Sequence, residues 1–151
     1  MPDPMDFDTT VKLNIYETFA KTARAPSGAE VAEALGVSGE AVAAAFDRLH
    51  KRRLLVPEPG NPSQIRMAPP FSGVETSFRV TVRGRDYFAN CIWDAFGIPA
   101  ALHADAVVEA ADGYTGEPIS LEVKDGRPVP HPWVIHFAVP AARWWENIIH
   151  T

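Results

Sequence analysis

The residue pair best suited to chemistry is Cys91 and Asp94, which lie three positions apart in the segment YFANCIWDAFG. Cys91 is the single cysteine of the chain. A cysteine thiolate is a soft ligand and nucleophile that prefers soft metals such as mercury or copper(I). A carboxyl group at the border of an apolar surface loses solvation, which raises its pKa and lets it carry a proton near neutral pH. The pair could therefore hold a soft metal and deliver a proton beside it.

A helix over residues 86–96 is expected to position this pair. At about 100° per residue, Tyr87, Cys91 and Asp94 fall on one stripe of that helix. The adjoining face is apolar and is expected to enter the core with Phe88, Ile92, Ala95 and Phe96. The opposite face is expected to meet water with Asp86, Asn90 and Gly97. Purely structural roles stay open at this point, because a lone cysteine is commonly a small buried hydrophobe and a helical aspartate is commonly solvated or paired.

The remainder of the second half is expected to form a sheet. Residues 78–83 alternate between apolar and polar side chains, which is typical of a strand with one buried face. Residues 106–109, 119–123 and 133–139 are further predicted strands, with a turn at Asp125 and Gly126. A last helix is predicted over residues 141–150. The pattern favours an α+β class, with a mixed-sheet domain over residues 69–151.

The first half is expected to be a winged-helix module over residues 1–68. A helix over residues 9–21 would have an apolar face formed by Val11, Leu13, Ile15 and Phe19. Ser27 and Glu30 form a capping-box pattern that opens a short helix to residue 35. Ser38 is positioned to cap a third helix that runs to about residue 53, and residues 54–56 and 65–67 read as a hairpin. Helix, helix–turn–helix and hairpin in that order are typical of a winged helix.

Nucleic acid is not expected as a partner of this module. The helix that would enter the major groove begins SGEAVAAA, and alanines and a glutamate cannot read bases as Arg, Asn or Gln do. The basic residues of this helix cluster at its other end, at Arg48, Lys51, Arg52 and Arg53, where positive charge suits a helix C-terminus. A packing role is therefore favoured over DNA binding.

Composition excludes several classes of protein. The 151 residues carry 14 Lys plus Arg against 19 Asp plus Glu, and a formal charge of −5 argues against a general polyanion binder. The sequence contains no apolar run of about 18 residues and begins with the acidic MPDPMDF, so neither a membrane span nor a secretory signal is expected. A cytoplasmic protein is the corresponding expectation. One cysteine precludes an intrachain disulfide and a multi-cysteine metal site.

Several segments resemble the alkylmercury lyase family. The resemblance is carried by residues 87–100 (YFANCIWDAFGIPA) and by residues 71–73, 78–80, 115–118, 136–140 and 144–148. Residues 15–68 resemble the N-terminal module of that family. The resemblance implies that a cysteine thiolate attacks mercury, that an aspartate relays a proton, and that the carbon group leaves as a hydrocarbon. It assigns the thiol and the proton relay, and with them the mercury ligands, to Cys91 and Asp94.

The same resemblance implies a second cysteine, for which this sequence has no counterpart. In related sequences it follows a tryptophan-rich helix, just beyond where this sequence stops at His150 and Thr151, and another cysteine often precedes the stretch at 115–118. A partner chain, a homodimer or a small thiol is expected to supply the second sulfur. No resident cofactor is expected: Hg(II) would be a bound product, and small thiols would be the co-reductant.

Three functional hypotheses follow. The leading one is an organomercurial-lyase-like enzyme that acts on a small-molecule substrate, with activity impaired by the missing thiol. The second is a reused lyase scaffold, or a subunit of a hetero-oligomeric enzyme, that acts on a non-mercury substrate in a biosynthetic pathway. The third is a winged-helix metal-sensing regulator, which the alanine-rich recognition helix weakens.

Overall fold

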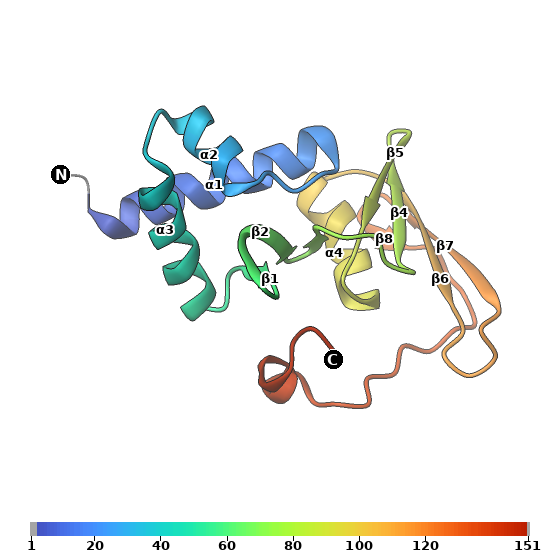
Figure 1. Cartoon of the computed structure of the whole chain (residues 1–151). Coiled ribbons are helices and arrows are strands. Elements are labelled where there is room, and N and C mark those ends of the chain that lie inside the picture. The colour runs from blue at the N-terminus through green and yellow to red at the C-terminus, as the bar shows by residue number, and fades with distance from the viewer. Residues whose placement is uncertain (1–2, 151) are drawn as a thin grey trace.

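The computed structural model describes residues 3–150 and begins with three helices (Figure 1). Helix α1 spans Pro4–Thr22, α2 spans Gly28–Leu35 and α3 spans Gly39–Lys51. Val11, Ile15 and Phe19 of α1 are buried, one on each turn, whereas Leu13 is 56% exposed and does not belong to the apolar face predicted for it. Both predicted helix starts are confirmed: Ser27 and Glu30 form a capping box, and Ser38 Oγ accepts from the N–H of Ala41.

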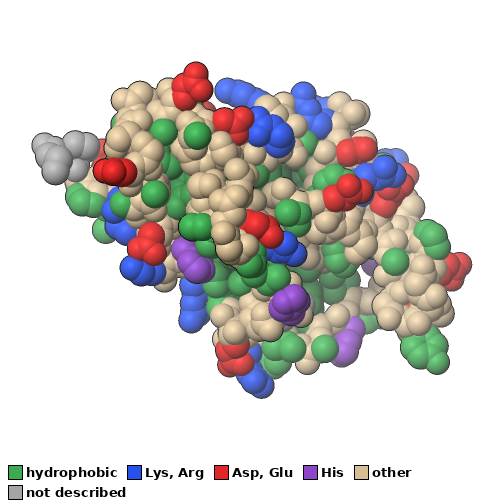
Figure 2. Space-filling view, viewed as in Figure 1, with side chains coloured by type: hydrophobic (Ala, Val, Ile, Leu, Met, Phe, Trp, Pro, Cys, Tyr) green, Lys and Arg blue, Asp and Glu red, His purple; other side chains and the backbone are tan. Residues whose placement is uncertain are grey.

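A small antiparallel sheet follows the helices. Strand β1 spans Val56–Glu58, β2 spans Asn61–Ala68 and β3 spans Phe71–Ser72, with β2 in the centre. The order of three helices and a hairpin is the expected one, and the assignment as a winged helix stays a prediction. On the face shown in Figure 2, acidic and basic side chains are interspersed. Such a surface does not offer the single basic stripe that a nucleic-acid backbone favours.

The second half contains a five-stranded sheet in the order β5-β4-β6-β7-β8. The strands are Arg79–Val82 (β4), Arg85–Phe88 (β5), Ala106–Ala111 (β6), Pro118–Lys124 (β7) and Arg127–Pro128 (β8). Helix α4, Ile92–Leu102, connects β5 to β6 and packs against β4 and β6. The α+β class is confirmed. Every described strand pair is antiparallel, so the sheet is not mixed in the sense of containing parallel neighbours.

The helix predicted over residues 86–96 is wrong in its first half. Arg83 and Gly84 both have positive φ, 50° and 75°, and form a two-residue turn that returns the chain as strand β5. Positive φ at both central positions is characteristic of the turns that suit the twist of a hairpin. Tyr87 therefore pairs with Val80 across the sheet, and the helix begins only at Ile92.

Two further predictions fail near the C-terminus. Residues 133–139 form no strand, and Val134 is 89% exposed. Prolines at 128, 130 and 132 remove backbone donors that a strand extending from β8 would need. A helix was predicted over residues 141–150, but the structure has a shorter 3₁₀ helix, Ala141–Glu146. It ends at Asn147, whose φ of −153° and ψ of 66° are not helical. This C-terminal segment curves back towards the start of α4 (Figure 1).

The two halves share one hydrophobic core. The Phe71 ring of β3 stacks on Phe19 of α1 with centroids 5.0 Å apart. Tyr87 donates its hydroxyl to the carbonyl of Ala20 at 2.6 Å, and Tyr16 donates to the carbonyl of Pro69 at 2.6 Å. The division at residues 68 and 69 stays a prediction, and these contacts cross it.

An ion pair between a buried carboxylate and a partly exposed arginine connects α1 to α3. Asp8 has a side chain only 3% exposed, and the guanidinium of Arg48 donates to both of its carboxylate oxygens at 2.7–3.1 Å. Replacing Arg48 by methionine should lower the free energy of unfolding by about 3 kcal/mol, because it leaves a carboxylate buried without its partner. Urea unfolding of R48M measures this loss. The exposed pair of Lys51 with Asp47 provides the control, since K51M should change stability by less than about 0.5 kcal/mol. Equal effects of the two variants would contradict the prediction.

Candidate functional site

Cys91 is the residue immediately before α4. Its backbone is extended, with φ −156° and ψ 179°, and it occupies the N-cap position of the helix. The thiol is half-buried, and burial raises its pKa above the usual value. The nearby carboxylate of Asp94 also raises the pKa, while backbone N–H groups of Asp94 and Trp93 at the helix start lower it. The sulfur is thus placed where amide donors can stabilise a thiolate once it forms.

Asp94 lies in the first turn of α4, so Cys91 and Asp94 are brought to the same end of one helix. Both line a cavity of about 270 Å³. Burial raises the pKa of the Asp94 carboxyl, and a hydrogen bond from Asn90 acts in the opposite direction. A raised pKa increases the fraction of the carboxyl that holds a proton, which is the property a general acid requires.

Asn90 is a site residue that the sequence analysis missed, because it was expected to face water. Its Nδ2 donates to Asp94 Oδ2 at 2.9 Å and to the carbonyl oxygen of Phe71 at 3.2 Å. The error follows from the misplaced helix: Asn90 precedes α4 and turns inward. Gly97, also expected to face water, lies against Pro70, where an added Cβ would come within 3.0 Å of the proline ring. The two-residue turn at Arg83 and Gly84 was the sequence signal for this arrangement.

Four parts of the chain form the walls of the cavity. The end of α3 and the end of β2 contribute Arg53, Met67 and Pro69. The start of α4 contributes Trp93, and the C-terminal segment contributes Phe137, Trp144, Trp145, Ile148 and Ile149. The Phe137 ring lies 6.5 Å from Trp93 and 5.1 Å from Trp144, centroid to centroid. The wall beside the thiol is therefore largely aromatic and apolar.

Tyr16 of α1 is a further titratable group close to this site. Burial, together with the charge of Asp94, raises the pKa of the Tyr16 phenol to about 12. Its hydroxyl is held by the Pro69 carbonyl. Tyr16 thus stays protonated at neutral pH and forms part of the poorly solvated surroundings of the carboxyl group.

The described residues contain no cluster of three or more His, Cys, Asp or Glu side chains that could hold a metal ion. Cys91 and Asp94 are the two candidate donors in the cavity. The arrangement thus offers one soft sulfur and one oxygen. Such a pair suits transient binding of a thiophilic metal compound better than a closed structural metal site.

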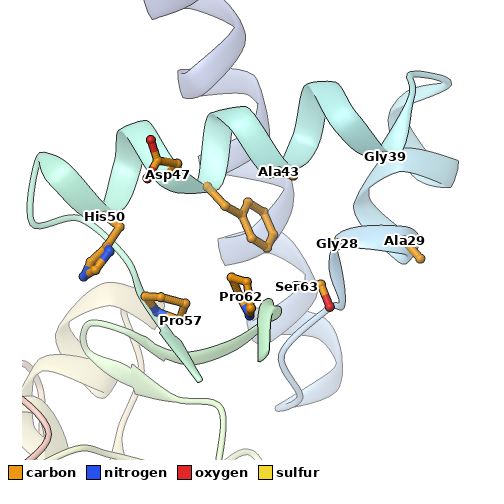
Figure 3. Close-up of a pocket in the computed structure, with 10 residues that line it drawn as sticks. Gly28, Ala29, Gly39, Ala43, Asp47, His50, Pro57, Pro62 and Ser63 are labelled. Carbon is orange, nitrogen blue, oxygen red and sulfur yellow. The ribbon is translucent and has the colours of Figure 1, made fainter. Parts of the chain in front are cut away.

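A second cavity, of about 340 Å³, lies between α2, α3 and the β1–β2 hairpin (Figure 3). It is lined by small and apolar residues together with Asp47 and His50. The carboxylate of Asp47 points away from the cavity and binds Lys51 at 2.7 Å (Figure 3). Ser63 and His50 lie at opposite ends of this cavity (Figure 3), and the Ser63 hydroxyl donates to Asn61 Oδ1 at 2.8 Å, so this cavity holds no activated nucleophile and the candidate site is the cavity at Cys91. Among the described helices none has the length and apolar character needed to cross a bilayer.

Comparison with known proteins adds two findings. The sequence profile of the alkylmercury lyases (MerB) matches residues 71–151, which is more than half of the chain. The crystal structure of the mercury-bound form of MerB2 superposes with a TM-score of 0.62 at 22% sequence identity, over 86% of this chain and 67% of that one. At this identity the structural likeness shows a shared fold. A search of curated protein sequences gave no match.

Proposed function

Because this chain belongs to the alkylmercury lyase family, we propose that it cleaves the carbon–mercury bond of organomercurials with Cys91 as nucleophile and Asp94 as proton donor. One observation carries the proposal: the only thiol of the sequence and a carboxyl group with a raised pKa line the same half-enclosed cavity. The aromatic wall of this cavity suits the organic group of the substrate.

The proposed reaction has two steps. The Cys91 thiolate first displaces the ligand X from R–Hg–X and forms an R–Hg–S bond. The electron pair of the carbon–mercury bond then takes the proton of the Asp94 carboxyl, so that R–H leaves. A thiolate from a small thiol binds mercury before the carbon–mercury bond breaks, and the proton released by that thiol restores the Asp94 carboxyl after R–H has left. For release, a second small thiol displaces the Cys91 sulfur, so that mercury leaves with two small thiolates and Cys91–SH is restored. Asn90 holds the carboxyl by its hydrogen bond to Oδ2.

The small thiol is included because the sequence has a single cysteine. Sulfur donation polarises the metal before the carbon is protonated, and two sulfurs bind mercury more securely than one. The second sulfur is proposed to come from a small thiol or from another chain. Excess thiol should therefore accelerate the second step without being needed for the first.

Methane release from methylmercury tests the proposal. Purified protein is incubated with methylmercury and excess small thiol, and methane in the headspace is measured by gas chromatography. We expect methane in amounts that exceed the protein, and almost none when the protein is omitted. Stoichiometric mercury binding without any methane would refute the lyase activity while leaving the thiol site intact.

The single thiol also favours the second candidate function, in which the scaffold acts on a non-mercury substrate or as a subunit of a larger enzyme. Purification from the native host would test it. A stable partner chain that carries a cysteine would support the subunit role, and a strictly monomeric protein would count against it. The regulator hypothesis has less support, because the exposed residues early in α3 are Gly39, Glu40, Ala43 and Ala44, which include no Arg, Asn or Gln for bidentate contacts to bases.

A further inference from the structure

The four basic residues near the end of α3 differ in what their side chains contact. Arg48 is bound by the buried Asp8, and Lys51 is bound by Asp47 at 2.7 Å. Arg52 caps the end of the helix through its backbone. Arg53 follows with a positive φ of 60°, and its N–H donates to the carbonyl of His50 at 2.9 Å. This turn brings Arg53 to the cavity that holds Cys91 and Asp94.

Arg53 is the only cationic residue among the residues that line this cavity. Within residues 3–150, no carboxylate forms an ion pair with its guanidinium. The only acidic lining residue is Asp94, and burial is the main cause of its raised pKa. A guanidinium without a partner at the edge of a small cavity is available for a carboxylate on a ligand, with which it can form two parallel hydrogen bonds.

The other residues that line the cavity indicate which chemical groups the remainder of such a ligand would contain. Trp93, Phe137 and Trp144 form a contiguous aromatic wall beside the thiol, and Trp93 stays 65% exposed. Flat apolar groups pack well on surfaces of this kind. A ligand that fits the cavity thus combines an aromatic body with an anionic end and presents a thiophilic centre to Cys91.

We infer that Arg53 is a specificity residue that favours arylmercurials bearing a carboxylate over uncharged arylmercurials. The inference rests on the proposed function, and it names the class of substrate that the proposed site would favour. It concerns the first step only, in which Cys91–SH and Ar–Hg–X give Cys91–S–Hg–Ar and HX. That step breaks the S–H and mercury–X bonds, forms the sulfur–mercury and H–X bonds, and changes no oxidation state.

The test measures how fast Cys91 is mercurated by 4-mercuribenzoate and by a phenylmercury salt. Because the chain has one cysteine, absorbance changes on mercuration report Cys91 alone. We expect the ratio of the two rates to fall about three- to fivefold in R53Q, which is the range for an exposed ion pair. The ratio should recover in part in R53K. It should stay unchanged in R52Q, because Arg52 is the neighbour of Arg53 in the sequence but does not line the cavity. In wild-type protein the ratio should also fall in 1 M salt.

Two results would overturn the inference. One is an unchanged ratio in R53Q. The other is an equal fall in R52Q and R53Q, which would attribute the preference for the carboxylate to the overall surface charge and not to Arg53. A wild-type ratio that does not respond to salt would overturn it as well, and this measurement needs no variant. Mercuration is measured without carbon–mercury cleavage. Loss of the lyase activity would therefore leave this test valid, and failure of the test would leave methane release unaffected.

Discussion

Replacing Cys91 by serine is expected to abolish stoichiometric mercury binding and to lower carbon–mercury cleavage more than about a thousandfold. A serine hydroxyl is a hard oxygen that stays protonated at neutral pH, so it neither binds a soft metal nor displaces a ligand from it. Mercury retained after gel filtration, measured by mass spectrometry, should fall from one atom per chain to none. One retained atom in C91S would show that another group binds the metal.

This substitution has a built-in control for folding. Cys91 is the N-cap residue of α4 and makes no side-chain capping hydrogen bond, whereas serine is among the preferred N-cap residues. The C91S variant should therefore unfold at the same temperature as the wild type or above it. Loss of mercury binding in a variant of undiminished thermal stability separates the chemistry of the sulfur from its packing.

Replacing Asp94 by asparagine should leave mercury binding in place and slow hydrocarbon release by about 10²–10⁴-fold, the usual contribution of a general acid. The side chain keeps its size beside Asn90 and loses the proton that the carbon requires. A single-turnover experiment on protein already loaded with methylmercury measures this step alone. Rapid methane release from loaded D94N would assign the proton to another donor.

The pH dependence of the same step follows from the direction of the Asp94 pKa shift. The carboxyl pKa is raised, so the protonated form persists above the ordinary range for aspartate, and the wild-type rate should fall as pH rises through the raised value. The D94N rate should lack this fall. Mercuration should show the opposite trend, since it needs the thiolate and the pKa of Cys91 is also raised.

The free energy of unfolding should also depend on pH through Asp94. A carboxyl whose pKa is raised by folding favours the folded state fully below its unfolded pKa, and this contribution is lost as pH rises through the folded pKa. The ionised form of Asp94 therefore opposes folding once the pH exceeds the raised pKa. The melting temperature of D94N relative to wild type should increase as the pH rises from 3 through the raised value, a further check that its loss of activity is not a loss of fold.

The helical first half was predictable because its signals are local. The capping box of Ser27 with Glu30 and the cap at Ser38 involve residues three positions apart. The strands at 106–111 and 118–124 were also found, although each is longer than predicted. The 133–139 strand failed because apolar side chains alone do not supply a neighbouring strand or the donors that the prolines remove.

The sequence predicted that Cys91 and Asp94 lie close together, but not their position relative to the helix. Cys91 and Asp94 were expected on one stripe in the middle of a helix, whereas Cys91 is the residue before the helix and Asp94 lies in its first turn. Helical periodicity over residues 86–96 was outweighed by the hairpin pairing of β5 with β4, and β4 is in turn held in the sheet by its long-range pairing with β6. Asn90 was missed for the same reason, because its partners at Phe71 and Asp94 depend on where the helix begins.

The packing of α1 against the second half links the stability of this helix to Asp94, the proposed proton donor. Phe71 stacks on Phe19 through its ring, while its carbonyl accepts from the Asn90 amide that holds Asp94. Anything that loosens α1 would therefore alter the orientation of the carboxyl group, and a ligand that fixes this group would stabilise α1 to the same extent, as thermodynamic linkage requires. A fragment limited to residues 71–151 would lose Tyr16 and Phe19, two of the three aromatic partners of Phe71, and the acceptor of Tyr87. The segment that carries the family profile thus depends on the preceding 70 residues for the order of its proposed catalytic groups.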